Sequence, residues 1–329
     1  MYHPIHPECL TLIQQGLQFD PLYGPELSNH LPMALIALTR CGASPLQLQR
    51  FYQHHTPNLQ PVRQQGHIQE TTPELGDRDS FPVFHQQFRQ QIAAQGVTPT
   101  LQEWLPVLLP GLAASAFHAL IRLSYALEAD DADEIAMALA YWASEYQPLG
   151  ALTLTDRYQA EEQLAQAYQR FHHVHIQPWI ITERIREVVA HPDYRPLAAV
   201  PDTLNEADMA RLTIGYYLAS NDFTLLHGVT SFDALRQLLP YVPDRQLALA
   251  YYWQAYVAAF CSAQTLHPIS SSPMTDIEAD WPSWFSAVTE MSDDHKIKLA
   301  YSCSRLYQVF PFEEYLTAIR MLLAHPESS

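Results

Sequence analysis

The residues best suited to chemistry lie in the stretch Asp293–Cys303, near the end of the chain. Either of the aspartates that open this stretch can cap a helix, and the following residues show helical periodicity. On such a helix His295 and Lys298 stand three positions apart and leave the same face, whereas Lys296 points elsewhere. An inward-facing lysine is costly unless its charge is compensated, so this pattern indicates a functional site.

Three further histidines occur in apolar runs with helical character, unlike most histidines of this chain. They are His30 in NHLPMALIAL, His118 in AFHALI and His227 in LLHGVT. Together with His295 and Lys298 they place four imidazoles and one lysine on four separate helices. This arrangement favours a metal site assembled in the core of one domain.

The balance of charge at such a site bears on the role of Lys298. Imidazole suits iron, zinc, copper and nickel, but histidines alone leave a metal cation uncompensated. A buried lysine with a depressed pKa can react with carbon dioxide, and the resulting anionic carbamate can bind metal through oxygen. The alternative is that Lys298 snorkels to solvent or pairs with a nearby acid.

Arg122 and Tyr125 follow His118 at positions that share its helix face, so both are candidate catalytic residues. Arg122 can orient an oxyanion, or it can simply pair with an acid. Other catalytic patterns are missing: the sequence has no G-x-S-x-G, P-loop, G-x-G-x-x-G or H-E-x-x-H motif. The triplet His172, His173 and His175 has a polar setting that favours scattered surface residues over a metal site.

Composition excludes several classes of function. The chain has 329 residues, only 10 glycines and a formal charge of −17, with alanine, leucine and glutamine at helical spacing. These features predict an all-α protein whose negative field disfavours nucleic acids and anionic membranes. Without a signal peptide, a membrane-length apolar run or paired cysteines, we expect a cytoplasmic protein with reduced thiols. The sequence does not set the oligomeric state.

We expect one compact all-helical domain over residues 1–329. Long surface connections are predicted at 56–79, 191–204 and 264–280, and the remainder is predicted to be helical with short turns. The predicted helices are 8–18, 29–40, 45–55, 80–95, 98–110, 112–128, 131–145, 157–170, 177–190, 205–220, 222–239, 244–263, 281–290, 293–308 and 312–325.

Four quoted segments, taken in order, resemble the questin oxidase family. They are Asn29–Met33 (NHLPM), Leu108–Ile121 (LLPGLAASAFHALI), Leu226–Thr230 (LHGVT) and the H-x-x-K pattern His295–Lys298. The resemblance extends from about residue 20 to 320. It implies an all-helical oxidoreductase, since fungal members of the family oxidise anthraquinone-type polyketides and open their rings.

The resemblance also implies a mononuclear non-haem iron centre, held by histidines and a modified lysine. The matching positions are His30, His118, His227, His295 and Lys298. The expected reactants are a small aromatic or quinone substrate and O₂, with oxygen insertion or C–C cleavage as the reaction. Some members are described as nicotinamide-dependent, but this sequence has no nucleotide-binding motif, so NAD(P)H would act from solution or through a partner.

Two other interpretations stay open at this point. The histidines can be satisfied core residues of a helical protein without catalysis, or they can bind zinc for hydrolysis. Convergence of the four imidazoles on one point would favour a metal site over the first interpretation.

Overall fold

The structure is a computed structural model and describes residues 2–63, 72–177, 179–269 and 277–324. Helices dominate this part of the chain, which confirms the predicted all-α class. The helices are α1 (Pro7–Gly16), α2 (Leu31–Cys41), α3 (Pro45–His55), α4 (Phe81–Gln95), α5 (Val97–Leu108), α6 (His118–Ala129), α7 (Ala132–Ser144), α8 (Ala160–Phe171), α9 (Ile181–Ala190), α10 (Tyr194–Leu197), α11 (Glu206–Ser220), α12 (Phe223–Leu238), α13 (Arg245–Cys261), α14 (Trp281–Val288), α15 (Asp294–Val309) and α16 (Glu313–Ala324).

Strands are minor elements of the described residues. An antiparallel pair joins β1 (Leu22–Tyr23) to β2 (Leu27–Ser28), and a parallel pair joins β3 (Leu154–Thr155) to β4 (Val200–Pro201). The β1–β2 hairpin leads directly into α2. It therefore sets the direction in which the chain enters that helix.

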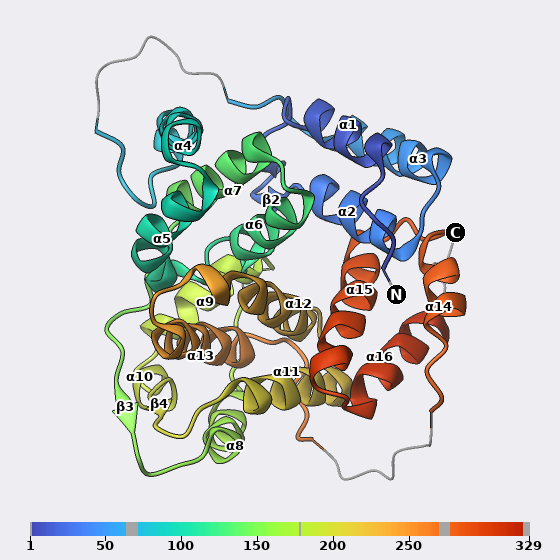
Figure 1. The fold of residues 1–329 in the computed structure, drawn as a ribbon. Coiled ribbons are helices and arrows are strands. Elements are labelled where there is room, and N and C mark those ends of the chain that lie inside the picture. Colours follow the sequence, from blue (N-terminus) through green and yellow to red (C-terminus); the bar gives the residue numbers. More distant parts are fainter. Residues whose placement is uncertain (1, 64–71, 178, 270–276, 325–329) are drawn as a thin grey trace.

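Helices α2, α6, α12 and α15 form a closed ring of contacts in the core. Helix α2 packs on α6, α6 on α12, α12 on α15, and α15 returns to α2. Figure 1 shows α2 and α15 side by side, although they belong to opposite ends of the sequence. His30 directly precedes α2, His118 begins α6, and His227 and His295 lie within α12 and α15. The contacts among these four helices therefore bring the four predicted imidazoles toward one place.

Local capping fixes where these helices start and stop. At the start of α12, Asp222 Oδ1 accepts a hydrogen bond from Thr224 N–H, and at the start of α15, Asp293 Oδ1 accepts one from His295 N–H. Helix α2 ends at Gly42 with a φ of 99°, a conformation that costs glycine little. The Asp293 cap holds His295 in the first turn of α15.

The structure differs from the predicted boundaries at two histidines. The helix predicted over 112–128 begins only at His118, because the preceding residues 115–117 adopt positive φ. The helix predicted from residue 29 begins at Leu31, and His30 is its N-cap residue. Both histidines therefore lie at helix starts, where the chain can aim a side chain away from the helix axis.

The predicted connections also contain local structure. Segment 191–204 holds α10 and β4, which pairs with β3, while parts of 56–79 and 264–280 lie outside the described residues. All four cysteines are free, in agreement with the expected reduced thiols, and all four are buried. In the described part of the chain, no helix is long and apolar enough to cross a membrane.

Buried apolar side chains from α1 through α16 belong to one continuous cluster. This cluster supports a single domain over residues 1–329, although the domain organisation stays a prediction.

Candidate metal centre

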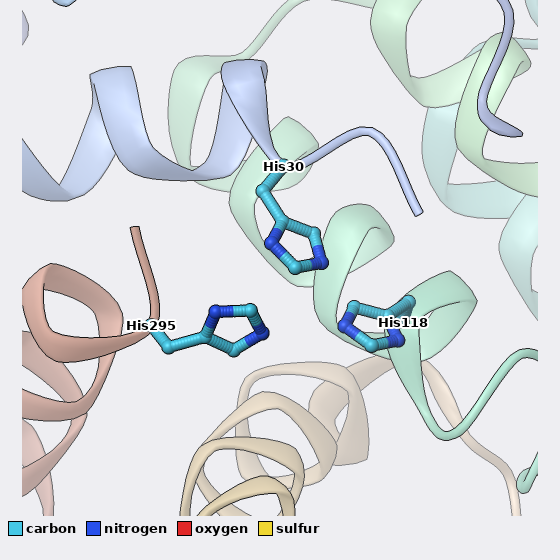
Figure 2. Close-up of side chains that lie close together, drawn as sticks. All are labelled: His30, His118 and His295. Atoms are coloured by element: carbon cyan, nitrogen blue, oxygen red, sulfur yellow. The ribbon is translucent and has the colours of Figure 1, made fainter. Parts of the chain in front are cut away.

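Four imidazole side chains lie close together between helices α2, α6, α12 and α15. They belong to His30, His118, His227 and His295, which we call the imidazole cluster. One ring nitrogen from each of His30, His118 and His295 lies within 4.8 Å of the others. Figure 2 shows these three rings, carried by three separate segments, facing a common space. The structure thus brings together the four histidines that the sequence singled out.

The closest contact in the cluster joins His118 and His227, whose Nε2 atoms are 3.2 Å apart. His118 Nδ1 lies 2.5 Å from the Ser115 carbonyl oxygen, and His227 Nδ1 lies 2.8 Å from that of Phe223. Because a carbonyl only accepts hydrogen bonds, each Nδ1 carries the proton of a neutral ring. Each Nε2 then presents a lone pair, and neither ring can donate to the other.

Burial keeps these rings uncharged. Desolvation, together with the neighbouring imidazoles, holds the pKa of His118 well below its ordinary value. The pKa of His227 is likewise held well below its ordinary value by burial and by His295. Burial lowers the pKa of His30 to about 3, despite the adjacent carboxylate of Asp294. These three imidazoles are therefore neutral near pH 7 and are able to act as ligands.

Asp294 contacts two histidines of the cluster and Lys298 through one carboxylate oxygen. Its Oδ1 lies 2.5 Å from His30 Nδ1, 2.9 Å from His295 Nδ1 and 3.4 Å from Lys298 Nζ. Although burial opposes ionisation, His30, His295 and Lys298 hold the pKa of Asp294 well below its usual range. A carboxylate that accepts the Nδ1 proton of a histidine fixes the opposite nitrogen as a lone pair, as in many metal sites.

Sequence reasoning missed this role of Asp294 and considered it only as a possible helix cap. The cap is Asp293, and Asp294 is the first residue of α15. A sequence signal was present, because Asp294 and Lys298 stand at i, i+4 on the same helix. The contact with His30, which lies 264 residues away, has no local signature.

Lys298 faces the cluster from α15, with only 2% of its side chain exposed. Burial lowers its pKa, and the Asp294 carboxylate opposes that shift. The unmodified side chain thus makes the ion pair that the sequence left open as an alternative. Lys296 lies instead in the wall of a different cavity, with Asn221 and Met321.

The donor set fits a metal ion by two observations. Two nitrogen ligands at about 2.1 Å from one metal are separated by about 3.0–3.4 Å, for bond angles between 90° and 109°. The 3.2 Å between His118 Nε2 and His227 Nε2 falls in this range. In addition, His30 Nε2 is buried and has no hydrogen-bond partner among the described residues. Three lone pairs without donors are therefore available in the same space.

A cavity of about 390 Å³ opens onto the cluster. Its walls include His30, His118 and His295, together with aromatic and apolar side chains of the hairpin and of the starts of α9 and α12. Charged side chains, among them Glu26, Arg184 and Asp294, also line it. Trp179 stands at this cavity with 62% of its surface exposed. A small molecule bound there would lie against the imidazoles.

Arg122 and Tyr125, the other predicted catalytic residues, do not line this cavity. Arg122 is buried and donates to both carboxylate oxygens of Glu134, at 2.7 and 3.0 Å. Tyr125 packs against Tyr301, and the Arg305 guanidinium lies 5.5 Å from its ring centre. Arg122 thus makes the pairing with an acid that was its alternative interpretation, and catalytic roles for both residues stay predictions.

Fold and site together define an all-helical protein with an imidazole cluster beside a buried carboxylate–lysine pair. Residues 27–214 match the questin oxidase-like family. Because this match covers more than half of the chain, the protein belongs to that family. The matched segment contains His30 and His118, and it ends before His227 and His295.

One curated protein with detectable similarity is the Baeyer-Villiger monooxygenase dmxR6 of Cryptosporiopsis sp. (strain 8999). It is 28% identical over 154 residues, which span 42% of this chain and 34% of the relative. This chain thus matches about a third of the relative's length.

Proposed function

We propose that this protein is an oxygenase that holds iron in the imidazole cluster and acts on an aromatic or quinone substrate of the polyketide type. Family membership and the monooxygenase activity named for the fungal relative support the oxygen chemistry. The observation that carries the metal site is the pair of facing lone pairs on His118 and His227, 3.2 Å apart.

In this proposal His30, His118, His227 and His295 are the nitrogen ligands. Iron, when bound, would supply O₂ binding and electron transfer. The chain contributes the orientation: carbonyl oxygens hold the Nδ1 protons of His118 and His227, and Asp294 holds that of His30. Because these protons are fixed, the Nε2 lone pairs need no rearrangement when a metal enters.

Lys298 is proposed as the fifth ligand, through a carbamate. Its burial and lowered pKa increase the fraction of free amine, which is the form that reacts with carbon dioxide. The carbamate would supply oxygen donors and negative charge beside a divalent cation. Asp294 is then available to hold His30 and His295.

The substrate is proposed to bind in the 390 Å³ cavity. Tyr23, Trp179 and Phe223 offer aromatic surface to a planar ring, while Ser28 and Thr182 offer hydroxyl groups to its polar substituents. A ring bound against these walls would have one of its edges toward the imidazoles.

Metal analysis and oxygen consumption test the proposal. Protein purified without chelators, or reconstituted anaerobically with Fe²⁺, should hold about one iron per chain. It should then consume O₂ in the presence of a hydroxylated anthraquinone, measured with and without NAD(P)H. His173→Ala, a change at an exposed histidine outside the cluster, should leave both readouts unchanged.

The outcomes separate the alternatives. Stoichiometric zinc without oxygen consumption would favour a hydrolytic site. Failure to bind any divalent metal would refute the metal site and favour a helical protein whose histidines are structural.

A further inference from the structure

The turn that precedes His118 has an unusual backbone. Ser115, Ala116 and Phe117 have φ values of 46°, 55° and 69°, although none of them is glycine. Side chains with a Cβ rarely adopt this left-handed region, and three in succession store strain. Such a turn persists only if surrounding contacts hold it in place.

The turn determines the orientation of the His118 imidazole. Both the backbone N–H and Nδ1 of His118 approach the same acceptor, the Ser115 carbonyl oxygen, at 3.2 and 2.5 Å. The strained conformation therefore folds the imidazole back onto the residue three positions earlier. This contact places the proton on Nδ1 and leaves Nε2 as the lone pair that faces His227.

A buried carboxylate holds the turn from the other side. Ser115 Oγ donates to Glu145 Oε2 at 3.2 Å, and Arg78 contacts both oxygens of Glu145, at 2.7 and 2.9 Å. Only 3% of the Glu145 side chain is exposed. Because this bidentate ion pair fixes the carboxylate, the hydroxyl of Ser115 is bound to a rigid acceptor.

Arg78 is itself positioned by α7. The turn before it is joined to α7 by a hydrogen bond from Gly76 N–H to the Ala143 carbonyl, at 2.9 Å. Gly76 has a φ of 82°, and a Cβ on it would come within 2.7 Å of the Tyr146 carbonyl oxygen. Only glycine permits this approach.

The same network reaches the hairpin that leads to His30. Arg78 Nη1 donates to Glu26 Oε1 at 2.6 Å, and Glu26 also has a positive φ, of 73°. Two residues further on, Ser28 Oγ is hydrogen-bonded to Tyr141 Oη of α7 at 2.7 Å. The end of α7 and Arg78 thus bind both segments that carry His30 and His118, whose rings stack at 4.5 Å.

We propose that Glu145 and Arg78 are positioning residues that hold the loops of His118 and His30 in the metal-binding geometry and fix the Nδ1 tautomer of His118. The part of this inference that concerns metal retention rests on the proposed function. The tautomer of His118 does not, because it can be measured in protein without metal.

The decisive variant is Glu145→Gln, which keeps an acceptor for Ser115 but removes the charge that fixes Arg78. In metal-free protein, long-range ¹H–¹⁵N correlation spectra should show a single Nδ1-protonated form of His118 in the wild type and a mixture of tautomers in the variant. The His118 signals are assigned by their loss in His118→Gln. With Co²⁺ as the probe, dissociation into excess chelator should be about 10–100-fold faster in Glu145→Gln.

Glu134→Gln is the matched control. It removes another buried carboxylate that pairs with an arginine, this one within α7, but Glu134 contacts neither histidine loop in the described structure. It should lower the melting temperature at least as much as Glu145→Gln, while Co²⁺ dissociation stays within about twofold of the wild type. Equal dissociation rates in the two variants would overturn the proposal.

Ser115→Ala provides a milder second variant if Glu145→Gln does not fold. It removes the hydroxyl that reaches Glu145 and keeps the carbonyl that faces His118. Mixed tautomers and faster Co²⁺ release are again expected, and an unchanged Nδ1 tautomer would refute the positioning role. A wild type that binds no metal but shows the single tautomer, lost in the variants, would refute the proposed function and leave the positioning of His118 established.

Discussion

Replacing Asp294 by Asn tests the central electrostatic contact of the site. The amide keeps the shape of the carboxylate but removes its charge, which leaves the Lys298 ammonium without its partner at 3.4 Å. Removing one member of a buried ion pair costs about 3–5 kcal/mol of folding free energy. Because 18% of the Asp294 side chain is exposed and the lysine can lose its proton, we expect about 3 kcal/mol.

Asp293→Asn is the matched control, since the neighbouring residue caps α15 and an asparagine caps as well as an aspartate. Its expected cost is below about 1 kcal/mol. Urea unfolding of metal-free protein at pH 7.5 measures both variants. Lys298→Met in the Asp294→Asn background should recover most of the loss, because no buried charge is then unpaired. Equal stabilities of Asp294→Asn and Asp293→Asn would refute the arrangement described here.

Three other predictions concern ligands, pH and the lysine. His118→Ala should abolish metal binding and lower the melting temperature of metal-treated protein, whereas His173→Ala should do neither, as measured by elemental analysis and calorimetry. In folded metal-free protein, the imidazoles of His30, His118 and His227 have lowered pKa values and stay neutral, whereas the same histidines protonate in the unfolded chain. The free energy of unfolding should therefore fall by up to about 4 kcal/mol per pH unit below about pH 6.5. A flat stability profile from pH 6.5 to 5 would contradict this prediction. Lys298→Arg should lose oxygen consumption, because a guanidinium forms no carbamate. Lys298→Ala should also lose it and should regain part of it when short carboxylic acids are added. Lys296→Ala should have almost no effect on oxygen consumption.

The interior positions of His30, His118 and His227 could be predicted because each lies in an apolar run, and that of His295 because it shares a helix face with Lys298. A histidine in such a run is expected to face the interior. Four interior imidazoles on helices of one core are then expected to lie near one another. The helix class followed from the same periodicity. The structure agrees with both expectations.

The turn before His118 could not be predicted, because its residues Ser115, Ala116 and Phe117 have no local signal for a left-handed backbone. Alanine favours helix, and the sequence predicts that helix 112–128 runs through this segment. The contacts that hold the turn come from Glu145 and, through it, Arg78, which lie far away in the chain. Tertiary hydrogen bonds thus override the local propensity.

The role of Asp294 was hidden for a similar reason. An acidic residue in the first turn of a helix is expected from the helix dipole alone, so its presence carries little information. What makes Asp294 special is the approach of His30, which depends on the packing of α2 against α15. The sequence shows the i, i+4 partner Lys298, but it does not show that His30, near the other end of the chain, is also a partner of Asp294.

Charge balance connects Asp294, Lys298 and the proposed metal. In the structure, the carboxylate and the ammonium cancel, and the buried imidazoles are neutral, so an added divalent cation would be uncompensated. Carbamylation of Lys298 changes its charge from +1 to −1, and carbamate, carboxylate and divalent cation then sum to zero. Because an uncompensated buried charge is expensive, metal binding and carbamylation should each favour the other.

This coupling has a direct consequence that can be measured. Metal affinity should fall when carbon dioxide and bicarbonate are removed from the buffer and should return when bicarbonate is added. Protein loaded under ¹³CO₂ should show a carbamate carbon signal that is absent from Lys298→Ala, and the metal affinity of that variant should not respond to bicarbonate. If wild-type affinity is the same with and without carbon dioxide, Lys298 is not a carbamylated ligand. Asp294 then remains the carboxylate nearest the site, and the pair with Lys298 must break for it to balance the metal.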